Sequence, residues 1–404
     1  MNIIVDENVP LADELLGELG DLQKRSGRSL SRSDVKKADA LIVRSVTPVN
    51  ESLLDGSSVA FVGTCTIGTD HVDKSYLAAH DIAFHSAPGC NANSVVEYVF
   101  CALTALSIPW WQPQAELTFG IIGCGNVGGA LYRQLQRLGI TVKVYDPFLS
   151  MEQCEHLSSF GDVIATDVIC VHTPYTTTGP YPTHHLLNHE VLLQLKPGAV
   201  LLNAGRGGVI DNAALHRVLA QRSDLKVVLD VWEHEPQIMV ELMHQVDIAT
   251  PHIAGYSVDG KARGTYMIYE RLCEHFGLPI RHSLPPLLGQ LKEQTPQARN
   301  ALITPDFSGN SMAEGHLGAV MKCVYDISED DRRFRQAMTA VAQEGVDQHG
   351  NKTLVAAFDR LRKHYPPRFE FSNFSLAELP VCRALFDKGG EQFKTPLLHI
   401  GFTP

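Results

Sequence analysis

Short apolar runs rich in β-branched residues alternate with helix-like segments along the chain as far as about Ile253. Such alternation is typical of parallel strands joined and covered by helices, so the pattern predicts an α/β fold. Two series of this kind follow one another, and a long apolar helix at about residues 93–106 separates them. The strands expected in the first series lie at residues 3–5, 40–43, 59–62 and 82–84.

The hydrophobic pattern changes at Leu284-Pro285-Pro286, and the rest of the chain is predicted to form a separate α+β module. Helices are expected after a capping box at Ser328 and across residues 354–361, where apolar positions recur at helical spacing. The apolar runs at residues 369–371 and 397–402 are interpreted as strands. The predicted domains are residues 1–92 completed by residues 255–282, then residues 93–254, and then residues 283–404.

Composition narrows the class of protein. A chain of 404 residues is too long for one compact core, in agreement with several domains. The formal net charge of −11 argues against a nucleic-acid partner. No apolar run is long enough to span a bilayer, and the N-terminus lacks the basic start and apolar core of a signal peptide. These features predict a globular cytoplasmic protein without a membrane partner.

The cysteines are typical of a reducing compartment. They number nine, they are widely spaced, and they form no C-x-x-C motif. This pattern predicts buried free thiols rather than disulfides or a structural zinc site. His184, His185 and His189 lie in a predicted surface helix, and no metal site is expected from them.

A glycine-rich loop follows the first strand of the second series. The apolar residues 118–122 lead into Gly123-Cys124-Gly125-Asn126-Val127-Gly128, and a helix and a further strand ending at Asp146 come next. In such a loop the first glycine permits a tight turn, the second lets backbone approach a pyrophosphate, and the third lets helix and strand pack closely. An acid about 20 residues further on can bind the ribose 2′-hydroxyl. The loop therefore predicts dinucleotide binding, and Asp146 favours NAD over NADP because a carboxylate repels a 2′-phosphate.

Three polar residues follow three later apolar runs: Arg206, Glu235 and His252. Because ligands of doubly wound sheets bind at the carboxyl ends of strands, all three can face one crevice. The fork of an arginine suits a carboxylate, and a histidine supported by a carboxylate suits proton transfer. Taken singly, they could also be a surface turn, a solvated loop acid and a structural histidine. Their order after a nucleotide loop favours hydride chemistry on a small acid.

These segments resemble the D-isomer-specific 2-hydroxyacid dehydrogenases over about residues 1–280. The resemblance rests on the glycine loop, on residues 203–208 and 230–236, on residues 250–255, and on the spacing between them. It implies that Arg206 binds substrate, that His252 is the acid/base, and that Glu235 supports the histidine. It also implies the following neighbours of NAD: Gly123, Gly125, Asn126, Val127, Gly128, Asp146, Thr173, Ala204, Arg206, Asp230 and Gly255.

A narrower resemblance, to one group within that family, comes from residues 43–47, 63–70 and 252–265 and from the extra C-terminal module. It implies a Rossmann-type nucleotide-binding domain, a flavodoxin-like substrate domain and a C-terminal α+β domain that forms a homodimer. Ser45, Thr66 and Tyr256 are then expected to contact the substrate together with Arg206. The implied reaction is the NAD-dependent oxidation of 4-phospho-D-erythronate at C2 to 3-hydroxy-2-oxo-4-phosphooxybutanoate, a step of vitamin B6 (pyridoxal phosphate) biosynthesis.

The residues that bind the substrate phosphate do not follow from the sequence. Arg44 is one candidate, while Arg332, Arg333 and Arg335 are better explained as a solvated helix face. Two other functions remain open. One is a different 2-hydroxyacid dehydrogenase, acting for example on 3-phosphoglycerate, and the other is a non-catalytic protein that senses NAD(H).

Overall fold

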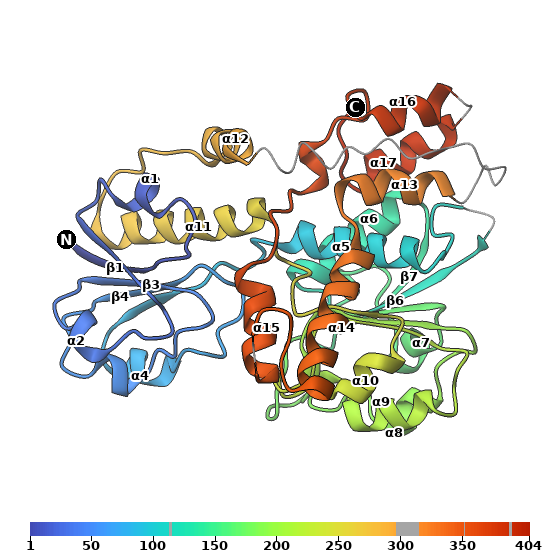
Figure 1. The fold of residues 1–404 in the computed structure, drawn as a ribbon, viewed down its shortest axis with the longest axis horizontal. Coiled ribbons are helices and arrows are strands. Elements are labelled where there is room, and N and C mark those ends of the chain that lie inside the picture. The colour runs from blue at the N-terminus through green and yellow to red at the C-terminus, as the bar shows by residue number, and fades with distance from the viewer. Residues whose placement is uncertain (113–114, 296–314, 351, 388–389) are drawn as a thin grey trace. The chain divides into compact units, whose positions relative to one another are not determined.

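The computed structural model describes residues 1–112, 115–295, 315–350, 352–387 and 390–404. These residues form two compact units, which Figure 1 draws with the chain coloured from its N-terminus to its C-terminus. The first unit contains residues 1–92 and 256–295, and the second contains residues 93–255 and the described residues from 315 onward. The chain leaves the first unit after Ala92 and returns to it after Gly255.

The first unit is built on a five-stranded parallel sheet with the strand order β2-β1-β3-β4-β5. This is the flavodoxin-like order, as predicted for the substrate domain. The carboxyl ends of β3 and β4, which are neighbours, lie at the same edge of the sheet. The strands are β1 (Asn2–Asp6), β2 (Asp21–Arg25), β3 (Ala40–Val43), β4 (Phe61–Thr64) and β5 (Ala83–His85).

Alternate residues of these strands pack on opposite faces, because successive side chains along a strand point in opposite directions. Ile3 and Val5 of β1 contribute to one core, whereas Ile4 between them contributes to the other. The first core lies against α1 (Ala12–Leu16), α11 (Val258–Phe276) and α12 (Leu284–Gln294). The second lies against α2 (Arg32–Val35), α3 (Glu51–Leu54) and α4 (Lys74–Ala79).

The second unit is built on a six-stranded parallel sheet with the order β11-β10-β9-β8-β6-β7. β7 lies on one side of β6 and β8 on the other, so the order reverses at β6 and creates the crevice in which Rossmann-type folds bind ligands. The strands are β6 (Thr118–Ile122), β7 (Thr141–Tyr145), β8 (Val168–Val171), β9 (Val200–Asn203), β10 (Lys226–Leu229) and β11 (Ile248–Ala249). The connecting helices are α5 (Ala92–Ala105), α6 (Asn126–Arg137), α7 (Phe160–Ile164), α8 (His189–Leu193), α9 (Asn212–Leu219) and α10 (Val240–Gln245).

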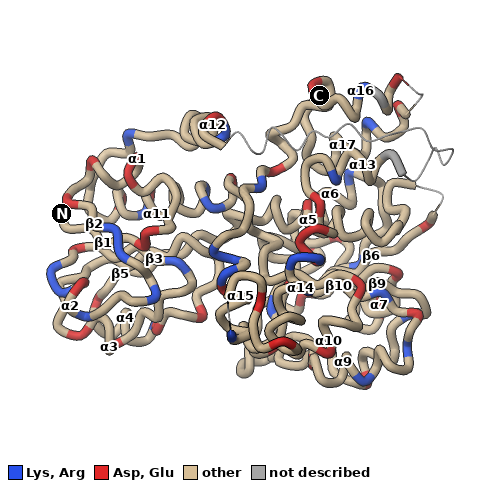
Figure 2. The backbone as a smooth tube through the Cα atoms, in the orientation of Figure 1, with Lys and Arg blue, Asp and Glu red and all other residues tan. Residues whose placement is uncertain are grey.

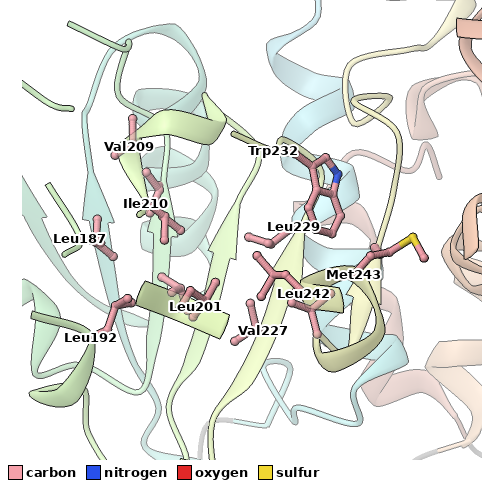
Figure 3. Packing of buried hydrophobic residues seen from close by; sticks show 14 of the residues in the cluster. Leu187, Leu192, Leu201, Val209, Ile210, Val227, Leu229, Trp232, Leu242 and Met243 are labelled. Atoms are coloured by element: carbon pink, nitrogen blue, oxygen red, sulfur yellow. The ribbon is translucent and has the colours of Figure 1, made fainter. Parts of the chain in front are cut away.

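One large hydrophobic core fixes the strand ends of this sheet. Figure 3 shows Leu201 of β9 and Val227 and Leu229 of β10 packed among side chains of the helices and loops that follow them. Trp232, which is only 2% exposed, anchors the loop after β10 in the same core. Residues that continue from these strands are therefore held on a rigid frame.

The C-terminal residues of the second unit are helical. The helices are α13 (Gly315–Val324), α14 (Ile327–Glu344), α15 (Leu354–Lys363), α16 (Pro380–Asp387) and α17 (Lys394–His399). Phe334 and Met338 of α14 and Phe358 of α15 belong to the same core as Trp232. The module predicted from residue 283 onward is thus divided between α12, which packs in the first unit, and α13 to α17, which belong to the second.

The two strands predicted in this module are wrong. Residues 369–371 run into a 3-10 turn, η4 (Phe371–Asn373), and residues 397–399 complete α17. A short apolar run does not by itself distinguish a strand from a buried turn of helix, and here tertiary packing decides. The only β pairing among the described residues of this region is an isolated bridge between Ser375 and Thr403.

Two expectations from composition can be compared with the structure. All nine cysteines are free thiols, and eight of them are buried, with Cys124 partly exposed. Among the described residues, no helix is both long and apolar enough to cross a membrane. Figure 2 shows acidic and basic residues spread along both units.

Candidate active site

The glycine loop has the geometry that its sequence predicts. Gly123 follows β6 with φ of +88°, and a Cβ there would come within 2.8 Å of the backbone of Thr173. A Cβ on Gly128 would lie 1.9 Å from the carbonyl oxygen of Gly123, so the start of α6 packs directly on the loop. A Cβ on Gly125 would meet nothing within 4 Å. The loop therefore leaves open space where the N-terminus of α6, at Asn126 and Val127, begins.

Asp146 is held beside this loop at the end of β7. Its Oδ2 accepts a hydrogen bond from the amide of Cys124 at 2.9 Å, and its Oδ1 accepts one from the amide of Phe148 at 3.1 Å. Each carboxylate oxygen has a second lone pair. Asp146 can therefore still accept a hydrogen bond from a sugar hydroxyl.

His172 was not singled out from the sequence, although it lies between β8 and Thr173. Both ring nitrogens are buried and lack a hydrogen-bond partner among the described residues. Burial lowers the pKa of His172 to about 4, so its imidazole is neutral at physiological pH. It adds no positive charge beside the glycine loop.

Arg206 follows β9 in a loop that is fixed by backbone contacts. The Asn203 side chain donates to the carbonyl of Arg206 and accepts from the amide of Gly205, each at 3.0 Å. Ala204 lies between Asn203 and Gly205 in this loop. A Cβ on Gly207 would lie 1.9 Å from the backbone of Trp232. The loop that carries Arg206 is thus pressed against the loop that leads to Glu235.

Asp230, predicted as a cofactor neighbour, is buried and organises the loop that carries His252. Its carboxylate accepts hydrogen bonds from the amides of Ile253 and Ala254 and from the hydroxyl of Thr250, at 2.7, 2.9 and 2.7 Å. Its carbonyl accepts the amide of His252 at 2.7 Å. His252 itself has φ of +57°, a conformation that residues with a Cβ seldom adopt. The bonds to Asp230 hold the histidine in it.

Glu235 and His252 form a hydrogen-bonded pair. The Nδ1 atom of His252 lies 2.7 Å from Oε2 of Glu235, and the amide of Trp232 donates to Oε1 at 2.7 Å. The side chains remain 20% and 33% exposed, for Glu235 and His252 respectively, so the pair is accessible. A carboxylate on Nδ1 fixes the imidazole tautomer and leaves proton exchange with a ligand to Nε2.

The pKa of Glu235 is set by opposing effects. Burial favours the neutral carboxyl, but the charge and hydrogen bond of His252 and the amide of Trp232 favour the carboxylate. They prevail, so the pKa of Glu235 lies below its ordinary value of 4.5. Arg362 of α15 adds a further favourable charge. Glu235 therefore stays ionised at the pH at which a histidine exchanges protons.

This shift predicts how stability depends on pH. A carboxylate with a lowered folded pKa contributes stability that is present above the unfolded value and is lost as pH falls through the folded value. We expect the difference in unfolding free energy between the wild-type protein and Glu235→Gln to shrink as pH falls below 4.5. Urea unfolding over this range measures it, with the exposed Glu241→Gln as control. A difference that grew towards acid would contradict the assignment.

The substrate residues expected in the first unit lie at strand ends. Ser45 follows β3 and is exposed, while Thr66 follows β4 and its hydroxyl bonds to Thr64 and to the carbonyl of Gly68 at 2.8 and 3.1 Å. Arg44 lies 3.5 Å from the carboxylate of Asp6. The structure therefore brings Ser45 and Thr66 to one edge of the first sheet.

Tyr256 lies two residues before the start of α11 in the same unit. The ammonium of Lys261 lies 4.3 Å from the centroid of the Tyr256 ring. Lys261 stands within residues 252–265, which carry the narrower resemblance, but it was not among the residues expected at the site. A cation one turn into the helix after an expected substrate residue was the available signal.

The arginines of α14 have structural partners. Arg332 pairs with Glu329, Arg333 with Asp330 and Arg335 with Asp331. Arg335 also donates to the carbonyls of Met243 and Val246. Only Arg332 lies on a solvated helix face, because Arg333 and Arg335 are partly buried, and their partners do not favour a phosphate site.

One group of side chains has metal-ligand types. The ligand atoms of His184, His185 and Glu233 lie within 4.8 Å of one another. Within the group, Nε2 of His185 is 2.6 Å from Oε1 of Glu233, and the two imidazoles stack at 3.8 Å. Glu233 also accepts the amide of Asn212 at 3.2 Å. Hydrogen bonding within the protein accounts for the group, and the absence of a metal stays a prediction.

Comparisons with known proteins agree with this fold. Residues 111–254 match the family model of the D-isomer specific 2-hydroxyacid dehydrogenase, NAD binding domain, and residues 300–384 match a domain of unknown function (DUF3410). D-lactate dehydrogenase from Aquifex aeolicus, solved with NAD and lactic acid, is 25% identical, with a TM-score of 0.57 over 68% of this chain and 96% of that chain. An NAD-bound 3-phosphoglycerate dehydrogenase of Entamoeba histolytica shares the fold at 24% identity, with a TM-score of 0.56 over 69% and 95%. The fold and the site define an NAD-dependent dehydrogenase of the D-isomer-specific 2-hydroxyacid class.

Closer relatives narrow the class. An erythronate-4-phosphate dehydrogenase of Cellvibrio japonicus is 51% identical over 93% of this chain and 94% of its own length. Another, of Teredinibacter turnerae, is 47% identical over 94% and 96%. The chain belongs to the erythronate-4-phosphate dehydrogenase family.

Proposed function

We propose that the protein oxidises 4-phospho-D-erythronate at C2 with NAD, giving 3-hydroxy-2-oxo-4-phosphooxybutanoate, and that it serves vitamin B6 biosynthesis in the cytoplasm. The observation that carries this proposal is the Glu235–His252 pair, at 2.7 Å, in the unit that also holds the glycine loop and Arg206. The relatives named above supply the identity of the acid.

The glycine loop fits NAD. Open space at Gly125, the amides at the start of α6 and the carboxylate of Asp146 match a pyrophosphate and a ribose hydroxyl. When bound, NAD accepts the hydride from C2 of the substrate. The residues proposed to hold it are Gly123, Gly125, Asn126, Val127, Gly128, Asp146, Thr173, Ala204, Arg206, Asp230 and Gly255. Asp230 acts there through the loop that it organises, because its carboxylate already accepts three hydrogen bonds.

His252 and Arg206 divide the work on the substrate. Nε2 of His252 removes the proton of the C2 hydroxyl as the hydride leaves, and the carboxylate of Glu235 stabilises the imidazolium that forms. The guanidinium of Arg206 holds the substrate carboxylate and polarises the developing carbonyl. His252 thus takes the proton, NAD takes the hydride, and Arg206 binds the substrate carboxylate.

Binding the phosphate group of the substrate requires positively charged side chains and hydroxyl groups. We propose that Ser45, Thr66 and Tyr256 contact the substrate from the first unit, and that Arg44 and Lys261 supply positive charge. Arg44 is partly committed to Asp6, whereas Lys261 lies beside the Tyr256 phenol. The described residues from 315 onward are proposed to form a homodimer.

Lys261→Gln should therefore raise the KM for 4-phospho-D-erythronate by about tenfold or more, because a charge-assisted bond to phosphate is lost. The KM for unphosphorylated erythronate and the affinity for NADH should change little. Lys74→Gln, an exposed lysine of α4, is the matched control. Equal effects on both acids would remove Lys261 from the phosphate site.

A substrate panel tests the function as a whole. Purified protein is given NAD with 4-phospho-D-erythronate or with 3-phosphoglycerate, and the formation of NADH is followed by absorbance. We expect 4-phospho-D-erythronate to be turned over faster. Faster turnover of 3-phosphoglycerate would favour another dehydrogenase, and binding of NADH without turnover of any 2-hydroxy acid would favour a sensing role.

A further inference from the structure

Two C-terminal residues bond to the chain on either side of the His252 loop. Oδ1 of Asp331, in α14, accepts the amide of Ala249 at 2.7 Å, just before the loop. Nη2 of Arg368, between α15 and α16, donates to the carbonyl of Ala254, just after it. All of these residues belong to the second unit. Both ends of the loop are thus tied to a region that lies outside the match to the dehydrogenase family model.

The carboxylate of Asp331 accepts a backbone amide of β11 that a further strand would otherwise bind. β11 is the last strand of its sheet, and within the described part of the chain it pairs with β10 alone, so its outer edge has no strand partner there. Such an edge exposes amides that need an acceptor. Asp331 supplies one, and Arg335 keeps it in place with a bond at 2.8 Å while donating to the carbonyl of Val246. The strand that leads to His252 is therefore fixed on its outer side by α14.

Arg368 is buried among charges. Its side chain stacks on the ring of Tyr325 at 4.2 Å, and the residue is 5% exposed. The carboxylates of Glu97 and Asp330, residues that are each 4% exposed, act electrostatically on this guanidinium. A buried guanidinium is costly unless it is paired, and the neighbouring carboxylates offset part of that cost.

The segment that carries Arg368 also holds α5 where the chain enters the second unit. The amide of Phe371 donates to Oε1 of Glu97, and the hydroxyl of Ser94 donates to Oε1 of Glu370, both at 2.8 Å. The chain enters this unit after Ala92 and leaves it after Gly255. Residues 368–371 therefore form hydrogen bonds close to both places where the chain passes between the units. The second of these places directly follows the His252 loop.

We propose that Arg368 and Asp331 are positioning residues for His252, and that the C-terminal region thereby contributes to the reaction. This inference rests on the proposed function. His252 has a left-handed backbone, and such a conformation persists only where its surroundings hold it. If the bond from Asp331 or the bond from Arg368 is removed, the loop becomes more mobile. His252 is then less often aligned with Glu235 and the substrate.

The first test compares Arg368→Met with Arg368→Lys in the full-length protein. We expect Arg368→Met to lower kcat by about tenfold to a hundredfold, the effect of misplacing a catalytic group by about 1 Å. The KM for 4-phospho-D-erythronate and the affinity for NADH should stay within about twofold, and Arg368→Lys should recover part of kcat. Arg383→Met is the matched control, because exposed Arg383 of α16 also donates to a carbonyl, that of Ala377 at 2.8 Å.

If Arg368→Met does not fold, a second pair of variants, at Asp331, tests the positioning role. Asp331→Ala removes the acceptor for Ala249, while Asp331→Asn retains an oxygen there. We expect a lower kcat for the alanine variant and near wild-type kcat for the asparagine variant. Glu329→Ala, which removes a side chain of the same helix that is 43% exposed, is the control. Wild-type kcat in Asp331→Ala and in every folded Arg368 variant would overturn the proposal.

Amide hydrogen exchange provides a readout that needs no substrate. Peptides covering residues 249–255 should exchange faster in Arg368→Met or Asp331→Ala than in the controls, while peptides of the first unit stay unchanged. An inactive wild-type protein would refute the proposed function but would leave this comparison decisive. Unchanged exchange in those peptides would refute the positioning role even in an active enzyme.

Discussion

His252→Ala is expected to lower kcat by about a thousandfold while leaving the affinity for NADH within about twofold of the wild-type value. General acid–base catalysis contributes about 10² to 10⁴ in rate, and His252 is the residue to which proton transfer is assigned. NADH binding is proposed to depend on the glycine loop and Asp146, and the hydrogen bonds of His252 go to Glu235 and Asp230 instead. Steady-state turnover of 4-phospho-D-erythronate and quenching of NADH fluorescence measure the two quantities separately.

The control for this variant is His80→Ala, which removes an exposed histidine of the first unit. His80 stacks on Tyr76 and lies outside the proposed site. It should leave both quantities unchanged. If His252→Ala retained wild-type turnover, the proton would have to leave through another group, and the roles of Glu235, Asp331 and Arg368 would fall with it.

Much of the fold could be predicted because buried parallel strands have a strong signature. β3 and β9 are fully buried, and their apolar sequences stand out from their surroundings. β2 was missed because its sequence, Asp-Leu-Gln-Lys-Arg, is polar, as suits a partly exposed strand at the edge of the sheet. Periodicity reports burial, so it fails where a strand is exposed.

The C-terminal region was harder for a related reason. Its two misassigned strands are short apolar segments whose conformation depends on contacts far away in the sequence, such as that of Phe371 with Glu97. The division of the predicted module between the two units depends in the same way on packing by Leu287 and Phe334. Such contacts leave no local pattern.

The site residues also fall into those that a local sequence pattern could place and those that depend on distant contacts. Residues that follow strands, such as Arg206 after buried β9 and Asp146 after the edge strand β7, could be placed because a strand fixes where its next residue lies. The bonds around His252 could not be foreseen, because Asp230, Asp331 and Arg368 bind residues 249–254 from three distant segments. The carboxylate of Asp230 also holds backbone amides, and this was not visible in the sequence. Sequence order therefore reveals which chemistry is present, whereas orientation comes from the packed structure.

Arg206→Lys is expected to lower kcat/KM by about a hundredfold to a thousandfold, although it keeps the positive charge. Loss of one donor to a developing oxyanion costs about this much, and a lysine cannot form the paired bonds of a guanidinium to a carboxylate. The Asn203 side chain still binds the backbone of residue 206, so the loop should keep most of its shape, although the bond from Nη1 of Arg206 to the carbonyl of Gly205 at 2.9 Å is lost. NADH affinity and the melting temperature should therefore change little.

Arg217→Lys, an exposed arginine in the last turn of α9, controls for the general effect of this replacement. Kinetics with the phosphorylated acid as varied substrate separate the two variants. If Arg206→Lys and Arg217→Lys were equally active, charge alone would suffice at position 206. The substrate carboxylate would then have to be oriented from the first unit, and Arg44 or Lys261 would be the residue to replace next.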